Sequence, residues 1–128
     1  MRVLVDTHTI LWAGLSPDRI GKRARAVLAQ KTNEVLVSAA SAWEIATKVR
    51  LGKLPGAEEL EREFISSVQD AGYTLLPITA AHALRAGRLS GDHRDPFDRI
   101  IAAQALALDI PILSADQKLE SFGISRIW

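Results

Sequence analysis

The stretch HRDPFDRIIAAQAL, residues 93–106, carries two aspartates three positions apart at the start of an apolar helical pattern. Asp95 before Pro96 is typical of a helix N-cap and first helical position, and Asp98 in the first turn complements the helix dipole. The same carboxylates can instead bind a metal ion if further acidic side chains lie beside them. The local spacing leaves both interpretations open.

Three more acidic residues are expected near Asp98, at one edge of a sheet. Asp6 directly follows the strand-like run RVLV, and Asp116 comes two residues after the run PILS. Glu44 lies in a helix entered from a third such run, EVLVS. Sites in open parallel sheets form beyond the carboxyl ends of the strands, so we expect these four side chains to converge there.

Each of these acids also has a purely structural interpretation. Ser41 and Glu44 fit a capping box, in which the glutamate bonds back to the cap residue. Asp6 and Asp116 can each cap a following turn. This interpretation is weakest for Asp6, because the run VLVD delivers its carboxyl group directly from a buried strand. Taken singly, none of these acids establishes a metal site.

The cluster as a whole favours a metal ion. Two unit charges about 4 Å apart repel by roughly 4 kcal/mol at an effective dielectric of about 20, so gathered carboxylates must take up protons, spread apart or bind a cation. Mg²⁺ and Mn²⁺ accept oxygen ligands, and such an ion can activate water for attack on a phosphodiester. No Walker A, GxGxxG or HExxH sequence occurs. Nuclease chemistry is therefore the favoured hypothesis.

The rest of the chain predicts the elements that would position these acids. Strands are expected at residues 2–6, 34–38, 73–78, 110–116 and 124–128, and helices at residues 7–15, 16–30, 41–53, 58–72, 80–89 and 96–109. Ser16 is expected to start the second helix and Thr79 to cap the fifth. The predicted core face of residues 58–72 consists of Leu60, Phe64, Ile65 and Val68.

Strands that alternate with helices predict an α/β fold. We expect a single domain over residues 1–128, with a central parallel sheet of four to five strands flanked by helices on both faces. No internal repeat, low-complexity tract or linker interrupts the pattern.

Composition narrows the class of protein. The 128 residues include 16 basic and 15 acidic side chains, a net charge of +1, which neither indicates nor excludes a nucleic-acid partner. The chain has no cysteine, which excludes disulfides and thiolate metal sites and is compatible with a reducing cytoplasm. We find no signal-peptide pattern and no apolar run near the roughly 18 residues of a membrane span. We therefore expect a cytoplasmic protein with no membrane partner.

Four segments resemble, in order and spacing, the motifs of PIN-domain proteins of the VapC toxin type: VLVDTHTILW, SAASAWEIATK, HRDPFDRIIAAQA and ILSAD. The resemblance extends from the first predicted strand to the last, and DPFDRIIAAQA is its most specific part. It implies a PIN-like fold and an endoribonuclease that hydrolyses RNA phosphodiesters with a water activated by Mg²⁺ or Mn²⁺. It also implies that the protein is the toxin of a type II toxin–antitoxin system.

The resemblance assigns metal binding and catalysis to an acidic quartet. Its members are Asp6, Glu44, Asp98 and Asp116. In many relatives the third acid immediately precedes an apolar helix run, which selects Asp98 over Asp95. Asp95 is then the helix cap, within reach of a water on the metal.

Neighbouring polar groups are implied to support the site or contact the substrate. Thr7 and Ser114 would bond to a quartet carboxylate or a metal-bound water, with a helix cap and a strand-end hydroxyl as the alternatives. His93 and Arg94 would contact a phosphate or the leaving oxygen, with a solvated loop as the favoured alternative. Lys48 lies four residues after Glu44, where a helical salt bridge is expected and a phosphate contact is the alternative.

The resemblance also implies partners. Family members usually form homodimers and bind an antitoxin whose C-terminal segment crosses the active-site groove. We therefore expect a cognate antitoxin protein, an RNA substrate and a homodimer, with residues 51–69 as the candidate antitoxin groove by analogy. Trp12 and Trp43 are expected in the core or at an interface, and stacking on a base is the alternative.

Other classes of protein fit less well. A haloacid-dehalogenase-like phosphatase needs a second acid two residues after the first, where this chain has His8. A phospho-accepting receiver domain needs paired acids near the first strand, and these are missing. The main alternative is a PIN-like module that binds RNA or a protein partner without cleavage. The presence of all four acids argues for cleavage.

Overall fold

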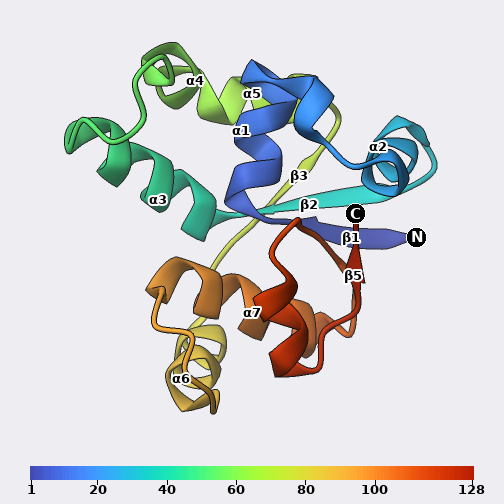
Figure 1. The fold of residues 1–128 in the computed structure, drawn as a ribbon, viewed down its shortest axis with the longest axis vertical. Coiled ribbons are helices and arrows are strands. Elements are labelled where there is room, and N and C mark those ends of the chain that lie inside the picture. Colours follow the sequence, from blue (N-terminus) through green and yellow to red (C-terminus); the bar gives the residue numbers. More distant parts are fainter.

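Five parallel strands form one sheet in the computed structural model, which describes all residues 1–128 (Figure 1). The strands are β1 (Arg2–Val5), β2 (Glu34–Ser38), β3 (Thr74–Leu76), β4 (Ile112–Leu113) and β5 (Arg126–Ile127). Their order is β3-β2-β1-β4-β5, and every neighbouring pair is parallel. The predicted α/β fold with a parallel sheet is therefore confirmed, and β1 lies at the centre of the sheet.

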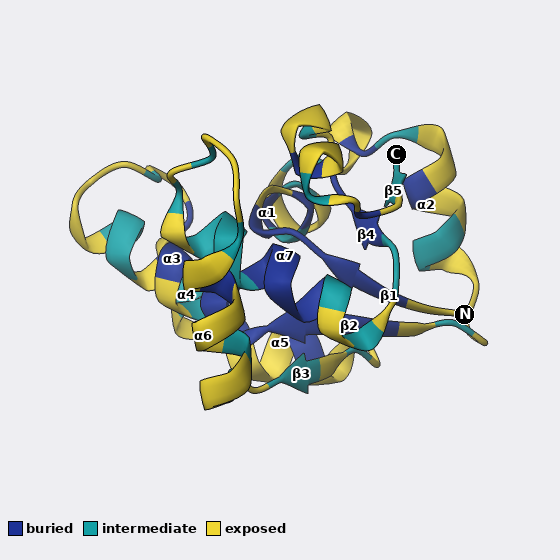
Figure 2. Cartoon of the chain, turned by 90° about the horizontal axis from the view of Figure 1, so that it is seen from below, coloured by how far each residue is buried: buried dark blue, intermediate teal, exposed yellow.

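Helices cover both faces of this sheet (Figures 1 and 2). They are α1 (Thr7–Leu15), α2 (Lys22–Ala29), α3 (Ala39–Arg50), α4 (Glu58–Arg62), α5 (Phe64–Asp70), α6 (Ala80–Arg88) and α7 (Pro96–Leu108), with short 3₁₀ helices η1 (Pro17–Arg19) and η2 (Gln117–Phe122). In Figure 1, α1, α4 and α5 lie on one side of the strands and α6 and α7 on the other. None of the helices combines the length and apolarity needed to cross a bilayer.

Alternate residues of the central strand face two separate hydrophobic cores. Val3 and Val5 belong to the first core and Leu4 to the second. The first core also contains Leu11, Ala24, Phe64 and Val68, and the second contains Ile101, Ala105, Ile112 and Leu119. Successive strand residues point to opposite faces, so a strand covered on both faces needs apolar residues throughout. This is why residues 3–5 of β1 and 35–37 of β2 are continuous apolar runs.

The helix predicted from Ser16 is interrupted. Pro17–Arg19 forms only a 3₁₀ turn, Ser16 makes no side-chain cap bond, and α2 begins separately at Lys22. The interruption lies where the chain end packs closely, because a Cβ added at Gly21 would lie 2.7 Å from Trp128 Cδ1. The prediction of one continuous helix is therefore wrong here.

The helix predicted over residues 58–72 is divided at Glu63 into α4 and α5. Phe64 and Val68 are buried and Leu60 packs against them, which places residues four positions apart on the core face. Ile65 follows Phe64 by one position, a rotation of about 100° around a helix axis. Its side chain is 61% exposed, so the prediction that Ile65 faces the core is wrong.

α3 begins at Ala39, and its N-cap is Ser38 at the end of β2. The Ser38 hydroxyl accepts a hydrogen bond from the backbone N–H of Ala40 at 3.0 Å. The predicted capping box of Ser41 and Glu44 is therefore wrong, because both residues lie inside a helix that has already begun. Glu44 occupies the second turn and is left free for another role.

The predicted caps of α6 and α7 are confirmed. Thr79 accepts a hydrogen bond from the backbone N–H of His82, and the His82 ring accepts one from the backbone N–H of Thr79. Asp95 Oδ1 accepts bonds from the backbone N–H groups of Phe97 (2.9 Å) and Asp98 (3.2 Å). These bonds orient the start of α7, which carries Asp98.

Replacing Ser38 with alanine tests whether this residue caps α3. We expect Ser38→Ala to lower the free energy of unfolding by about 1 kcal/mol, the usual effect of losing a serine cap. Ser66→Ala is the control, because the exposed Ser66 hydroxyl bonds only to Glu63, and we expect a change within about 0.5 kcal/mol. Urea denaturation followed by circular dichroism measures both. Equal stabilities of the two variants would contradict the assignment.

Candidate metal centre

The four acids of the predicted quartet lie on segments that meet at the carboxyl edge of the sheet. Asp6 follows β1 and caps α1, and Asp116 follows β4 and caps η2. Asp98 lies in the first turn of α7, and Glu44 lies on α3, which follows β2. Because β1 pairs with both β2 and β4, the segments that carry these acids are neighbours.

Asp98 is difficult to ionise in this environment. Burial raises the pKa of Asp98, and the negative charges of Asp95, Glu44, Asp6 and Asp116 raise it further, to about 7. The other three members of the quartet therefore act on Asp98 electrostatically. A divalent cation would reverse this effect, because a nearby positive charge favours the ionised carboxylate.

Asp6 is buried, and different partners hold its two oxygens. Oδ1 accepts hydrogen bonds from the backbone N–H of Thr9 at 2.9 Å and from the Thr9 hydroxyl at 2.6 Å. Oδ2 accepts a hydrogen bond from the Ser114 hydroxyl. Burial raises the pKa of Asp6, and these hydrogen bonds oppose that effect only in part. The bonds fix the direction of the carboxylate between β1 and β4.

Thr9, and not the predicted Thr7, supports a carboxylate of the quartet. The Thr7 hydroxyl lies 3.0 Å from the Ser41 hydroxyl, a bond that links α1 to α3 instead of reaching a carboxylate. Ser114 does bond to a quartet carboxylate, as predicted. The signal for Thr9 was present in the run DTHT, because a helix N-cap contacts the residue three positions later.

Glu44 has one paired oxygen and one unpaired oxygen. Oε2 accepts a hydrogen bond from Lys48 Nζ, the salt bridge expected at this helical spacing. Burial lowers the pKa of Lys48, but the bond to Glu44 and the charges of Glu44, Asp95 and Asp98 outweigh this effect and raise it. Glu44 is only 2% exposed, and its Oε1 has no hydrogen-bond partner. Such an oxygen is costly to bury, and a cation would satisfy it.

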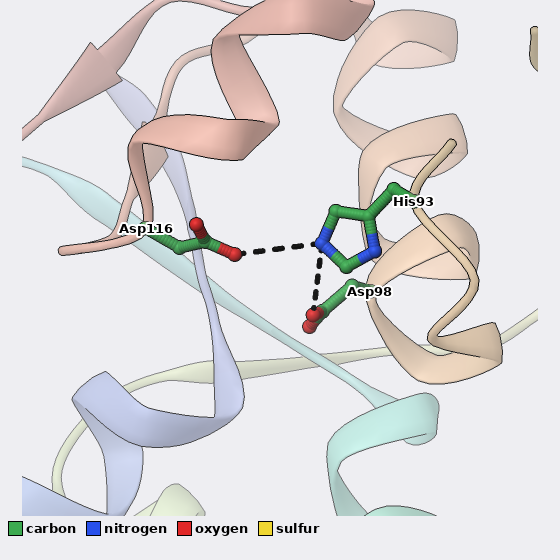
Figure 3. A group of neighbouring side chains, drawn as sticks. All are labelled: His93, Asp98 and Asp116. Carbon is green, nitrogen blue, oxygen red and sulfur yellow. Dashed lines mark hydrogen bonds and ion pairs between the residues drawn. The ribbon is translucent and has the colours of Figure 1, made fainter. Parts of the chain in front are cut away.

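His93 joins the cluster through its ring nitrogen Nε2 (Figure 3). This atom lies 3.4 Å from Asp98 Oδ2 and 3.4 Å from Asp116 Oδ2. The ring stacks on Phe122 with a centroid distance of 5.9 Å, and only 12% of the side chain is exposed. The expectation of a solvated loop is therefore wrong for His93, whereas the adjacent Arg94 is exposed.

Arg99 fixes the loop that carries His93. Its guanidinium donates hydrogen bonds to the backbone oxygens of Ala86 at 3.0 Å, His93 at 2.9 Å and Leu89. Arg99 belongs to α7 and Ala86 to α6, so these bonds tie the loop to both helices. The loop is thereby held in place beside the carboxyl edge of the sheet.

The groups present fit a divalent cation. The quartet offers carboxylate oxygens, which hard divalent ions accept, and His93 adds a nitrogen. Ligand atoms of His93, Asp98 and Asp116 all lie within 4.8 Å of one another. The unpaired oxygen of Glu44 and the raised pKa of Asp98 both indicate negative charge that the protein leaves uncompensated.

Trp12 and Trp43 have different surroundings. Trp12 is half-buried, with the Trp128 ring 5.6 Å away and the Arg19 guanidinium 4.4 Å from its centroid. Trp43 is 54% exposed and packs edge-on against Phe97 at 4.6 Å. Trp43 is therefore a surface residue, and its ring is accessible to a partner.

The PIN-domain family matches residues 3–124, nearly the whole chain. The chain belongs to the PIN-domain family. One relative, Ribonuclease VapC16 of Mycobacterium tuberculosis, is 38% identical over 68 residues. These residues are 53% of this chain and 48% of that protein, so the match covers about half the length of the curated relative. The resemblance drawn from the sequence motifs is thus confirmed at the level of the family.

Solved structures of VapBC proteins share the fold over nearly the whole chain. VapBC2 from Rickettsia felis, bound to a promoter DNA fragment, has a TM-score of 0.73 at 14% identity and full coverage of both chains. VapBC-1 from Haemophilus influenzae has a TM-score of 0.68 at 18% identity, covering 98% of this chain and 96% of that one. VapBC-5 from Mycobacterium tuberculosis has a TM-score of 0.65 at 18% identity, covering 98% and 97%. At these identities the similarity shows the fold alone.

The raised pKa of Asp98 predicts how the stability of the metal-free PIN domain depends on pH. Its ordinary pKa is 3.8 and its folded-state pKa is about 7, so the folded state holds this proton more tightly. The stabilisation from protonated Asp98 is fully present below pH 3.8 and is lost as the pH rises through about 7. In EDTA, Asp98→Asn should therefore be more stable than the unchanged protein at about pH 8, and this advantage should shrink toward about pH 5.

Thermal unfolding in EDTA at both pH values measures this effect. Asp70→Asn is the control, because Asp70 is exposed on α5 and belongs to no charge cluster described above. Its effect on Tm should be the same at both pH values. An advantage of Asp98→Asn that does not change with pH would contradict the electrostatic argument.

Proposed function

We propose that this chain is a metal-dependent endoribonuclease and the toxin of a type II toxin–antitoxin pair. The observation that carries the proposal is the acidic cluster, in which Glu44 keeps a buried, unpaired oxygen and the pKa of Asp98 is raised to about 7. Membership of the PIN-domain family and the similarity to a relative named as a ribonuclease support it. The cation we assign is Mg²⁺ or Mn²⁺, because both accept carboxylate oxygens.

The residues that would hold this cation are the quartet Asp6, Glu44, Asp98 and Asp116. When bound there, such an ion supplies a water activated for attack and stabilises the charge that develops on a phosphodiester. The substrate we propose is RNA. Asp95 remains the cap of α7, and its charge adds to the negative potential of the site.

The remaining groups prepare the quartet for its role. Ser114 and Thr9 orient Asp6 through hydrogen bonds, so its carboxylate does not have to be ordered when the cation arrives. Lys48 compensates one oxygen of Glu44 and leaves the other unpaired. Asp98 holds a proton in part of the population near pH 7 and would release it to solvent if a cation bound, because a ligating carboxylate must be ionised.

Cleavage of RNA tests the proposed function directly. The purified chain, freed of any antitoxin, is incubated with labelled total RNA in Mg²⁺, Mn²⁺ or EDTA. We expect discrete fragments with either ion and none in EDTA. Asp98→Asn should reduce the rate by about 100-fold or more, because it removes one ligand and its charge. Asp70→Asn should cleave normally. RNA that binds but stays uncut in every metal would instead support the non-cleaving binding module.

A groove between α1, α4 and α5 supports an antitoxin partner. Its volume is ≈ 450 Å³. Its apolar lining includes Ile10, Leu28, Leu60, Phe64 and Val68. Glu59 and Glu63 lie beside these side chains, and the groove reaches Thr9, which holds Asp6. We propose that an apolar segment of the antitoxin, flanked by basic residues, binds here. The similarity to solved VapBC structures supports this partner.

A charge placed in this groove should weaken antitoxin binding. Leu60→Glu places a charge where the apolar segment would pack, and burying an unpaired charge is costly. We therefore expect at least about a tenfold loss of affinity, or roughly 1.4 kcal/mol. Leu84→Glu is the control, because Leu84 is 56% exposed on α6 on the other side of the sheet. Titration calorimetry with the antitoxin measures both variants, and RNA cleavage confirms that each is folded. Equal affinities would contradict the proposed position of the antitoxin.

We also propose that the protein acts as a homodimer in the cytoplasm, where its RNA substrate is present. The exposed ring of Trp43, packed on Phe97, forms an apolar surface that a second copy would cover. Light scattering of the purified chain distinguishes the dimer from the monomer.

A further inference from the structure

We propose that His93 is a nitrogen ligand of the cation in this site, and that the site consequently favours Mn²⁺ and later divalent transition ions over Mg²⁺. The inference rests on the proposed function, because it concerns the same metal centre. It adds His93 as a ligand outside the acidic quartet. It also predicts which of the ions accepted by carboxylates this site binds most tightly.

The position of the imidazole carries this inference. Nε2 of His93 lies 3.4 Å from one oxygen of Asp98 and 3.4 Å from one oxygen of Asp116. Two ligand atoms that each lie about 2.1 Å from a shared ion are separated by at most about 4.2 Å. Both separations fall within this limit, and Figure 3 shows the nitrogen directed between the two carboxylates. The ligand atoms of all three groups lie within 4.8 Å of one another, so a small approach of the two carboxylates would let the three groups share one ion.

His93 is held in this position by contacts outside the acidic cluster. Phe122 stacks on one face of the ring, with planes 28° apart. Arg99 binds the backbone oxygen of His93 and the backbone oxygen of Leu89, so both ends of the short loop are fixed. A histidine that is 12% exposed and braced from two sides loses little conformational freedom when it binds an ion.

Glu44 indicates that a cation belongs in this cluster. Its side chain is 3% exposed, its Oε1 lacks any partner, and its charge acts on Asp98. His93 does not reach this oxygen as a hydrogen-bond donor. A histidine that only compensated Asp98 and Asp116 by charge would leave the buried oxygen of Glu44 without a partner. A cation held by His93, Asp98 and Asp116 would also place positive charge near Glu44, whose own charge acts on Asp98.

The ligand set determines the preferred ion. Carboxylate and water ligands suit Mg²⁺ and Mn²⁺ alike, whereas imidazole is a poor ligand for Mg²⁺ and a common one for transition ions. One nitrogen among several carboxylates should therefore shift selectivity toward Mn²⁺. Along the first transition series, affinity should rise further beyond Mn²⁺.

Pulsed electron paramagnetic resonance on the Mn²⁺-loaded chain tests the inference without measuring activity. An imidazole nitrogen bonded to Mn²⁺ produces a nitrogen hyperfine coupling. We expect this coupling in the unchanged protein and in the control His8→Gln, which removes an exposed imidazole from the first turn of α1. The coupling should be absent in His93→Gln. Titration calorimetry should show Mn²⁺ affinity of His93→Gln reduced by roughly tenfold or more, and Mg²⁺ affinity by less than about threefold.

Three results would overturn the inference while leaving the proposed function intact. The first is Mn²⁺ binding to the unchanged protein without a nitrogen coupling, and the second is a coupling that persists in His93→Gln. The third is tighter binding of Mg²⁺ and Mn²⁺ by His93→Gln, which is expected if the histidine competes with the ion for the carboxylates. Absence of any Mn²⁺ or Mg²⁺ binding to the unchanged protein, or undiminished binding by Asp98→Asn, would overturn both the inference and the proposed metal centre.

Discussion

Mutual repulsion among carboxylates at the carboxyl edge of the sheet is the constraint that shapes this PIN domain. Burial and four neighbouring acids raise the pKa of Asp98 to about 7. Other groups around the edge reduce this repulsion only in part: Lys48 bonds to one oxygen of Glu44, and Ser114 and Thr9 bond to Asp6. The charge that remains destabilises the metal-free fold at neutral pH, and under the proposed function it would give a cation its affinity for the site.

The fold brings the acids together while still using them as helix caps. In Asp116 the two oxygens have different roles. Oδ1 caps η2 by accepting the backbone N–H of Lys118, and Oδ2 faces His93. At the start of α7 two different residues have these roles. Asp95 caps the helix by accepting its first backbone N–H groups, and the Asp98 side chain makes no capping bond. Capping and metal binding are therefore compatible interpretations of the same acidic pattern. The central strand β1, buried on both faces, provides the rigid position from which Asp6 projects.

The sequence predicted those parts of the fold that depend on local pattern. Buried strands appear as apolar runs, and Asp95 before Pro96 marks the start of α7. The start of α3 was misplaced because Ser38 and Ser41 are equally good caps, and only the end of β2 selects between them. The position of His93 could not be predicted, because Phe122 and Arg99 hold it and their contacts arise from the packing of η2 and α7. Local patterns thus located the acids, whereas tertiary contacts placed the groups that surround them.

Anomalous diffraction from crystals of the full chain soaked in Mn²⁺ would test most directly whether the gathered carboxylates hold a cation. If they do, the strongest anomalous peak will lie among the side chains of Asp6, Glu44, Asp98 and Asp116, and it will disappear in crystals of Asp98→Asn. Mn²⁺ bound only elsewhere on the surface, with the carboxylates still bonded only to protein groups, would contradict the idea that their repulsion is relieved by a metal ion.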